Sequence, residues 1–216
     1  HPYAIAVHGG CNVVDENSRI LRRGVRPGQF RLRDQLCGNI PCQPSVLMRR
    51  KPLFDVGLLD ARLNYVMDFD LWLKLGLKGD FVAINSIQAN YRVHCRSKSI
   101  AQVDSFLPEI LLVLDRFFAQ PDLPHQIRKV RRKAYSDFYA EEAPHSIYRP
   151  RHLMTPEKVR RMRRSLLTSI RYYPFRLKTL LTIAEIADSY LPPSHRPRLR
   201  NVVKLPYLLL ENLRRP

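Results

Sequence analysis

Two carboxylates at the start of one predicted helix are the residues of this sequence best suited to do chemistry. Asp68 and Asp70 stand two residues apart within residues 66–75, and the only Trp of the chain, Trp72, follows them. A positioned carboxylate can act as a general base and take a proton from a substrate hydroxyl. Carboxylates also complement the dipole at a helix N-terminus, so the pair by itself leaves both interpretations open.

A histidine further along the chain is surrounded by cationic and hydroxyl side chains. His94 lies at the centre of the run YRVHCRSKS, residues 91–99. Imidazole can ligate a divalent metal, and arginine, lysine and hydroxyl groups can bind phosphate oxygens. A surface loop of ordinary polar residues is the competing interpretation of this run.

A proline-containing loop precedes the carboxylate pair. It has the sequence NIPCQPSV, residues 39–46. Pro44 stiffens this loop, and Gln43 and Ser45 have groups that can hydrogen-bond sugar hydroxyls. A polar turn between a helix and a strand would have the same composition.

In this order and spacing, the three motifs resemble the acceptor-side, C-terminal half of family 2 glycosyltransferases, which have the GT-A fold. The resemblance covers about residues 5–103 and implies an α/β domain with a partial GT-A, Rossmann-like mixed sheet. It also implies that Asp68 is the general base of an inverting sugar transfer. Gln43, Ser45 and Asp70 would then contact the acceptor. In the family this Asp is often the second residue of a Glu-Asp pair, and here Met67 stands in place of the Glu.

The same resemblance implies a donor side. Arg92, Ser97 and Lys98 would bind the donor diphosphate, and His94 would ligate a divalent metal, Mn²⁺ or Mg²⁺. The family holds this metal mainly through an Asp-x-Asp motif in an N-terminal nucleotide-binding half. We find neither the motif nor this half in the sequence. Residues 68–70 read Asp-Phe-Asp, but they stand at the position of the base. We therefore expect a fragment that begins after the donor site and is inactive alone.

Strands and helices alternate up to about residue 104, which is typical of an α/β sheet. Strands are predicted at residues 4–7, 12–15, 46–48, 81–84 and 88–93, and helices at 31–37 and 68–76. Beyond this point only helices are predicted, at 105–118, 125–143, 156–172, 175–190 and 205–213, with Thr155 as one N-cap. We therefore expect two domains, a GT-A half at 1–104 and an all-α helical extension at 105–216.

The positive charge of the chain is concentrated in the predicted extension. The formal net charge is +18, and residues 105–216 hold 22 Lys and Arg against 10 Asp and Glu. Such an excess indicates an anionic partner, and basic amphipathic helices can bind an anionic membrane surface. We regard nucleic acid as a less favoured partner than a membrane, because no nucleic-acid-binding motif accompanies the charge. The solvated face of a helical bundle is the competing interpretation.

Cysteine spacing and hydropathy bear on the compartment. The four cysteines, Cys11, Cys37, Cys42 and Cys95, show no Cys-x-x-Cys spacing, which predicts free thiols in a reducing cytosol. No apolar run approaches the roughly 20 residues of a membrane-spanning helix. We expect a cytoplasmic protein, and leave open a peripheral position at the inner face of the cell membrane.

The expected function follows from the resemblance. It implies an enzyme that transfers a sugar from a nucleotide-sugar donor to a glycan or lipid-linked acceptor, in polysaccharide or cell-envelope biosynthesis. The alternative is a non-catalytic basic adaptor whose helices bind anionic membrane or nucleic acid. Sugar transfer that depends on Asp68 would distinguish the two, because an adaptor would be indifferent to Asp68 and its binding would be steeply salt dependent.

Overall fold

The computed structural model describes residues 1–25, 27–147 and 155–174. The chain divides into two compact units, His1–Ala134 and Tyr135–Pro216, which are described separately below. The first unit extends beyond residue 104, the domain boundary expected from the sequence. The helices predicted at 175–190 and 205–213 lie outside the described residues.

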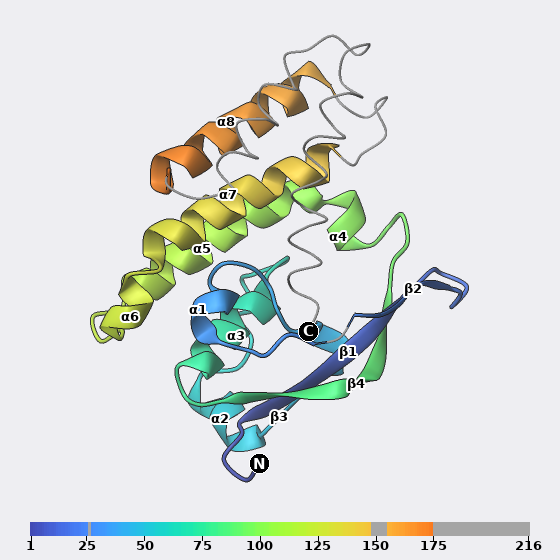
Figure 1. Ribbon diagram of the computed structural model, residues 1–216, viewed down its shortest axis with the longest axis vertical. Helices are drawn as coiled ribbons and strands as arrows, with labels where there is room; N and C mark the ends of the chain where they lie inside the picture. Colours follow the sequence, from blue (N-terminus) through green and yellow to red (C-terminus); the bar gives the residue numbers. More distant parts are fainter. Residues whose placement is uncertain (26, 148–154, 175–216) are drawn as a thin grey trace. The chain divides into compact units, whose positions relative to one another are not determined.

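A four-stranded mixed sheet lies at the centre of the first unit (Figure 1). β1 (Ala6–Val14) pairs antiparallel with β3 (Val46–Met48) near its start and antiparallel with β2 (Ile20–Val25) near its end. β4 (Phe81–Arg92) runs parallel to β1 along its whole length. Together with the helices, this sheet confirms the mixed α/β class.

β1 and β4 are each longer than the sequence predicts. Separate strands are expected at 4–7 and 12–15, and at 81–84 and 88–93, yet β1 and β4 each run without a break. The pairing of β1 with β4 continues past Gly9 and Gly10, with irregularities in its register there. Gly9 is required there, because an added Cβ would press on the Gln88 side chain and lie 3.0 Å from the Ser86 carbonyl oxygen.

The core of the first unit lies between the sheet and α3 (Met67–Gly76). The apolar residues at i and i+4 of this helix pack against β1 and β4, as the periodicity predicts. The core cluster contains Ile5, Ala6, Phe30, Leu71, Trp72, Leu75 and Phe81. The Trp72 ring is 1% exposed and meets the Phe81 ring edge-on at 5.9 Å, so it belongs to the core and presents no platform to a sugar.

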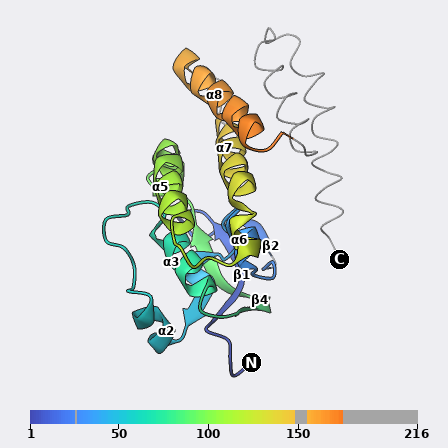
Figure 2. The same ribbon diagram turned by 90° about the vertical axis from the view of Figure 1, so that its left-hand side faces the viewer.

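Short helical elements connect the remaining parts of the first unit. They are α1 (Leu32–Gln35), η1 (Gln43–Ser45, a 3-10 turn), α2 (Arg50–Asp55), α4 (Lys98–Ala101), η2 (Val103–Ser105) and α6 (His125–Arg128). The longer α5 (Phe106–Phe118) packs beside α3, and Figure 2 shows the two from the side. α5 therefore belongs with the sheet, although the sequence assigns it to the extension.

Two helices continue beyond the first unit. α7 (Arg131–Ile147) begins at its end and runs into the second unit, so the helix predicted at 125–143 is replaced by α6 and α7. α8 (Pro156–Tyr172) has the bounds that the sequence predicts. Thr155 caps it as expected, with its Oγ1 accepting a hydrogen bond from the Lys158 backbone N–H at 3.3 Å. Among the described residues, none of the helices combines the length and the apolar character needed to cross a membrane.

Cys11 and Cys42 form a disulfide, so the prediction of four free thiols is wrong. Cys11 lies in β1, and Cys42 immediately precedes η1. The antiparallel register that pairs His8 with Val46 brings the two cysteines together across 31 residues of sequence. Cys37 and Cys95 lie outside this bond, and Cys95 is exposed. Spacing rules miss such a pair because a strand register, set by distant residues, creates it.

His8 is a fully buried polar residue in β1. It is 0% exposed, and neither ring nitrogen has a hydrogen-bond partner in the described part of the chain. Burial lowers the pKa of this imidazole because the charged form would lose its hydration. The residue is therefore held in its neutral form.

We expect His8 to make the free energy of unfolding fall as the pH drops below about 6.5. The unfolded chain takes up a proton on His8 there, whereas the folded protein does so only at a lower pH, so acid favours unfolding. The slope contributed is about 1.4 kcal/mol per pH unit. Urea unfolding of wild type and His8→Leu at about pH 7.5 and about pH 5.5 measures it, with His1→Ala as control. The same pH dependence in wild type and His8→Leu would contradict this expectation.

Candidate functional site

Asp68 lies, half-buried, in the first turn of α3. Its Oδ1 accepts a hydrogen bond from the Phe69 backbone N–H at 2.7 Å, and the Asn39 side chain also hydrogen-bonds to the carboxyl group. These bonds favour the charged form, but burial outweighs them and raises the pKa of Asp68 above its ordinary value. Asp68 is thus a stronger base than an ordinary surface aspartate.

Asn39 is held in place by a buried amide. Gln35, 0% exposed at the end of α1, donates from Nε2 to Asn39 Oδ1 at 3.0 Å. Its Oε1 accepts from the Ile40 backbone N–H, also at 3.0 Å. Because an ionised carboxylate can only accept hydrogen bonds, the Asn39 amide nitrogen is the group that donates to Asp68. Sequence reasoning missed this chain of contacts, although the four-residue separation of Gln35 and Asn39 was a usable signal.

Asp70 is directed to another side of α3 from Asp68. Two residues correspond to about 200° of rotation around a helix. Asp70 is 7% exposed, and its Oδ2 lies 2.6 Å from Lys74 Nζ, one turn further along. The charge of Arg62 also acts on this carboxylate. The carboxylate of Asp70 is thus paired within the helix, and its expected contact with an acceptor stays a prediction.

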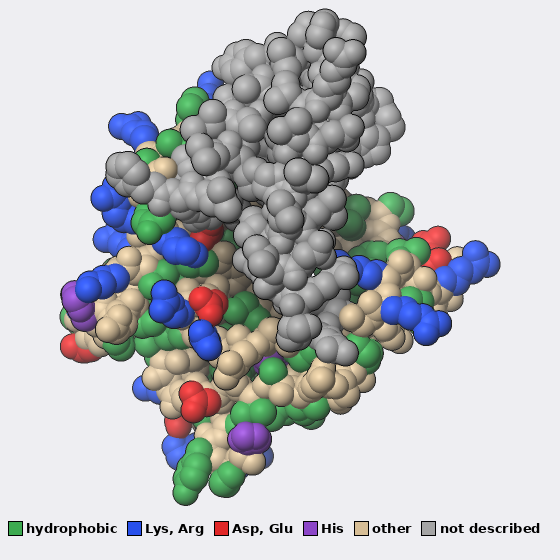
Figure 3. Space-filling model, viewed as in Figure 1, with side chains coloured by type: hydrophobic (Ala, Val, Ile, Leu, Met, Phe, Trp, Pro, Cys, Tyr) green, Lys and Arg blue, Asp and Glu red, His purple; other side chains and the backbone are tan. Residues whose placement is uncertain are grey.

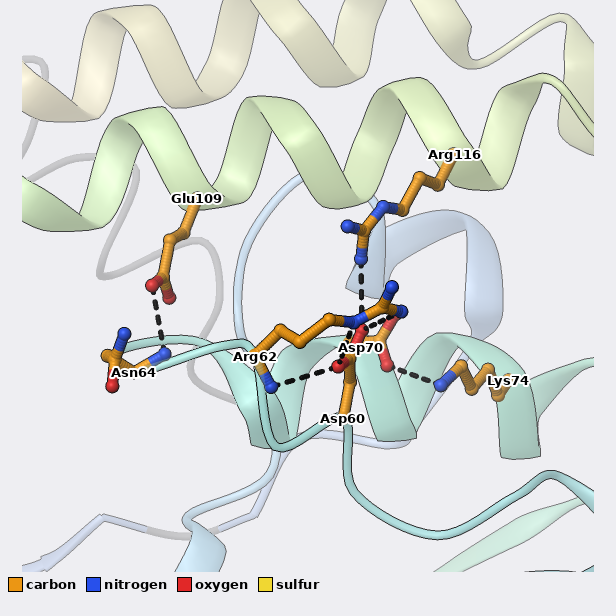
Figure 4. Close-up of polar contacts among 7 residues, drawn as sticks. All are labelled: Asp60, Arg62, Asn64, Asp70, Lys74, Glu109 and Arg116. Carbon is orange, nitrogen blue, oxygen red and sulfur yellow. Dashed lines mark hydrogen bonds and ion pairs between the residues drawn. The ribbon is translucent and has the colours of Figure 1, made fainter.

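A third aspartate, Asp60, links the segment before α3 to α5 (Figure 4). Asp60 accepts hydrogen bonds from Arg62 Nε at 2.8 Å and Arg62 Nη2 at 2.9 Å, and from Arg116 Nη1 of α5 at 3.0 Å. The hydrogen bonds from Arg62 hold the pKa of Asp60 well below its usual range. Asp60 therefore stays charged and connects α5 to the segment that leads into the site.

Glu109 of α5 binds the segment that leads into α3. Its carboxylate accepts from three successive backbone N–H groups, those of Asn64 at 2.9 Å, Tyr65 at 2.7 Å and Val66 at 3.2 Å. Val66 is the N-cap residue of α3 and has no capping hydrogen bond from its own side chain. Glu109 thus accepts from the N-cap N–H and from the two N–H groups before it, and it places a negative charge near the N-terminus of α3, where the helix dipole favours one.

We expect Glu109→Ala to lower the free energy of unfolding by about 2 kcal/mol, because three N–H groups lose a charged acceptor. Glu109→Gln, which keeps one acceptor oxygen, should lose less. Urea unfolding measures both, and Glu16→Ala, an exposed acidic residue of the β1–β2 turn, is the matched control. Equal stabilities for Glu109→Ala and Glu16→Ala would show that the contact is not structural.

The two other expected acceptor residues lie in η1. Gln43 is exposed at its first position, four residues after Asn39. Ser45 is 6% exposed; its hydroxyl lies 2.8 Å from each of the carbonyl oxygens of Gly9 and Cys42 and accepts from the Gly9 N–H. Ser45 thus has a structural role, and its expected contact with an acceptor stays a prediction, whereas Gln43 is accessible to a ligand.

The expected diphosphate residues are engaged with the protein itself. Arg92 donates to the carbonyl oxygens of Asp15 and Glu16, both at 2.8 Å, and to Ser18 Oγ, so it closes the β1–β2 turn. Ser97 Oγ accepts from the His94 N–H at 3.0 Å. Lys98 Nζ donates to the Asn64 carbonyl oxygen at 2.8 Å. In the structure these three residues hold the β1–β2 turn, the segment after β4 and the segment before α3, and their expected binding of a diphosphate stays a prediction.

His94 follows β4 and is half-buried. Within residues 1–25, 27–147 and 155–174, no three His, Cys, Asp or Glu side chains gather in a group that could hold a metal ion. His94 could therefore offer one ligand, and the expected binding of Mn²⁺ or Mg²⁺ stays a prediction.

Comparison with protein-family models, with curated proteins and with solved structures finds no match for this chain. The geometry of the site brings together Asp68, Asn39 and Gln35, with Gln43 exposed in the same connecting segment.

Proposed function

We propose that this chain is the acceptor-side part of an inverting glycosyltransferase, with Asp68 as the general base. The observation that carries the proposal is the state of the Asp68 carboxyl group. Burial raises its pKa, while the Asn39 amide and the Phe69 N–H fix its orientation. A base that is both oriented and more basic than usual is what activation of a weakly acidic hydroxyl requires.

The reaction proposed is a single displacement. An acceptor hydroxyl oxygen attacks the anomeric carbon of the donor sugar and forms the new C–O bond. The bond from that carbon to the diphosphate oxygen breaks, and the nucleoside diphosphate leaves with the electron pair. The hydroxyl proton passes to Asp68, and the anomeric configuration is inverted because attack and departure occur on opposite faces.

The contacts around Asp68 supply preorganisation in this proposal. Gln35 and Asn39 hold the carboxylate from the α1 side, and Glu109 holds the segment that enters α3. A general base must lie within hydrogen-bond reach of the proton it removes, so small displacements of α3 would cost rate. Gln43, exposed in the segment after Asn39, is the residue we assign to an acceptor hydroxyl. The acceptor class, a glycan or lipid-linked glycan of the cell envelope, comes from the sequence resemblance.

The test is to incubate the natural protein that contains this chain with a panel of nucleotide-sugars, Mn²⁺ or Mg²⁺, and glycan or lipid-linked acceptors. The expected result is release of a nucleoside diphosphate that requires an acceptor and yields a product of inverted anomeric configuration. Retention of configuration would overturn the single displacement. Absence of transfer from every donor, together with salt-sensitive binding to polyanions, would favour the basic adaptor instead.

A further inference from the structure

The inner face of α8 is already occupied within the second unit. Ser169 Oγ donates to the Ser136 carbonyl oxygen of α7 at 2.8 Å, and the Tyr172 ring stacks on that of Tyr135 with centroids 5.1 Å apart. Met162 and Leu166, on the same inner face, are buried at 3% and 0% exposure. This face therefore cannot also insert into a bilayer, as the sequence pattern alone would allow.

The outer face of α8 carries a stripe of cations, which we call the arginine stripe. Arg160, Arg164, Leu167 and Arg171 are all exposed, and their separations of four, three and four residues align them along one side of the helix. In Figure 3, Lys and Arg side chains are visible on the flank where Figure 1 draws α8. None of the ion pairs found among the described residues involves these arginines.

Arg128, in the basic run of residues 128–133, differs from the arginine stripe. Arg128 donates to the backbone carbonyl oxygens of Leu123 and Pro121, and so closes the turn before α6. Its guanidinium is therefore used inside the protein. The arginine stripe instead presents its charges outward, with α8 as a whole holding six Lys and Arg against the single acidic residue Glu157.

We propose that the arginine stripe binds the surface of an anionic membrane. Arg160, Arg164 and Arg171 span about 16 Å of helix and would contact lipid phosphates, to which guanidinium groups bind through paired N–H donors. Leu167 is 54% exposed between them and would reach the acyl boundary. The stripe contains no aromatic ring on which nucleic-acid bases could stack, so a membrane fits it better than single-stranded nucleic acid.

Membrane binding by the arginine stripe does not depend on sugar transfer, and each can be tested without the other. Because the apolar face of α8 is covered, the binding is electrostatic, and its strength should fall steeply as salt is added. Each Lys or Arg held close to an anionic surface contributes about 1 kcal/mol, so three of them are expected to change the affinity about 100-fold.

The experiment measures binding of the whole chain to vesicles of phosphatidylcholine with about 30% phosphatidylglycerol, and to phosphatidylcholine vesicles alone, by co-sedimentation. Wild type is compared with the triple variant Arg160→Gln, Arg164→Gln, Arg171→Gln. The matched control is Arg19→Gln, Arg22→Gln, Lys78→Gln, which removes three exposed cations of the first unit. Circular dichroism and the thermal midpoint verify that both triple variants fold as wild type does.

The expected result is binding only to the anionic vesicles, weakened about 100-fold in the stripe variant and little changed in the control. A smaller loss is expected for Leu167→Ser. Equal weakening in both triple variants would overturn the proposal, because net charge alone would then explain the binding. Failure of wild type to bind the vesicles while it binds duplex DNA would also overturn it and identify nucleic acid as the partner.

Discussion

Replacing Asp68 with Asn is expected to slow sugar transfer by about 100- to 10,000-fold, the usual contribution of a positioned general base. Asparagine has nearly the same shape and can keep the contacts at the start of α3, but it cannot accept the hydroxyl proton. The loss should therefore appear in kcat, with little change in KM for the donor or acceptor. The measurement is steady-state transfer by the natural protein that contains this chain.

Asp70→Asn is the matched control for Asp68→Asn. The two residues share a helix and a chemical type, but Asp70 is paired with Lys74 on another side of α3. We expect near-normal transfer from this variant, because asparagine keeps the shape of Asp70 and the residue lies on another side of α3 from the base. Full transfer activity in Asp68→Asn, or an equal loss in both variants, would remove Asp68 from the role of base.

The pH dependence of transfer gives a second check on Asp68. A general base works only when it is deprotonated, so activity falls as the pH drops through its pKa. Because burial raises the pKa of Asp68, the acid limb of kcat/KM should lie at a higher pH than an ordinary aspartate would produce. An acid limb at the ordinary position would mean that another group limits the rate.

Removal of the Cys11–Cys42 disulfide is expected to lower the free energy of unfolding by about 3 to 4 kcal/mol. The bond joins residues separated by 31 positions, and opening so long a loop returns conformational entropy to the unfolded chain. The bond also holds the segment that carries Asn39, the partner of Asp68. Urea unfolding of Cys11→Ser measures the loss.

Cys95→Ser is the matched control for Cys11→Ser, because Cys95 is exposed and lies outside the disulfide. It should leave the stability almost unchanged. Alkylation of the unreduced, denatured wild-type protein should modify two of its four cysteines. Modification of all four, with equal stabilities for the two variants, would show that the pair is reduced in solution.

Features that depend on neighbours along the chain were accessible from the sequence. The bounds of α8 and its Thr155 cap were predictable, because capping groups and helical periodicity act within a few residues. The burial of Leu71 and Leu75 followed from their one-turn spacing. Asp68 was also recognised as a candidate base from the motifs near it in the sequence, but its role in sugar transfer stays a prediction.

Only the tertiary structure decided which polar groups are occupied. Glu109 reaches N–H groups 43 to 45 residues away, Arg92 closes a turn more than 70 residues earlier, and Ser45 bonds to Gly9 across the sheet. The Cys11–Cys42 pair depends on the register of β1 and β3 in the same way. Such contacts have no local signature, because burial and strand pairing, to which the whole chain contributes, bring the partners together. The sequence by itself thus indicated α3, α5 and α8 and the candidate base, while the packing of α5 and the sheet determined what holds that base in place.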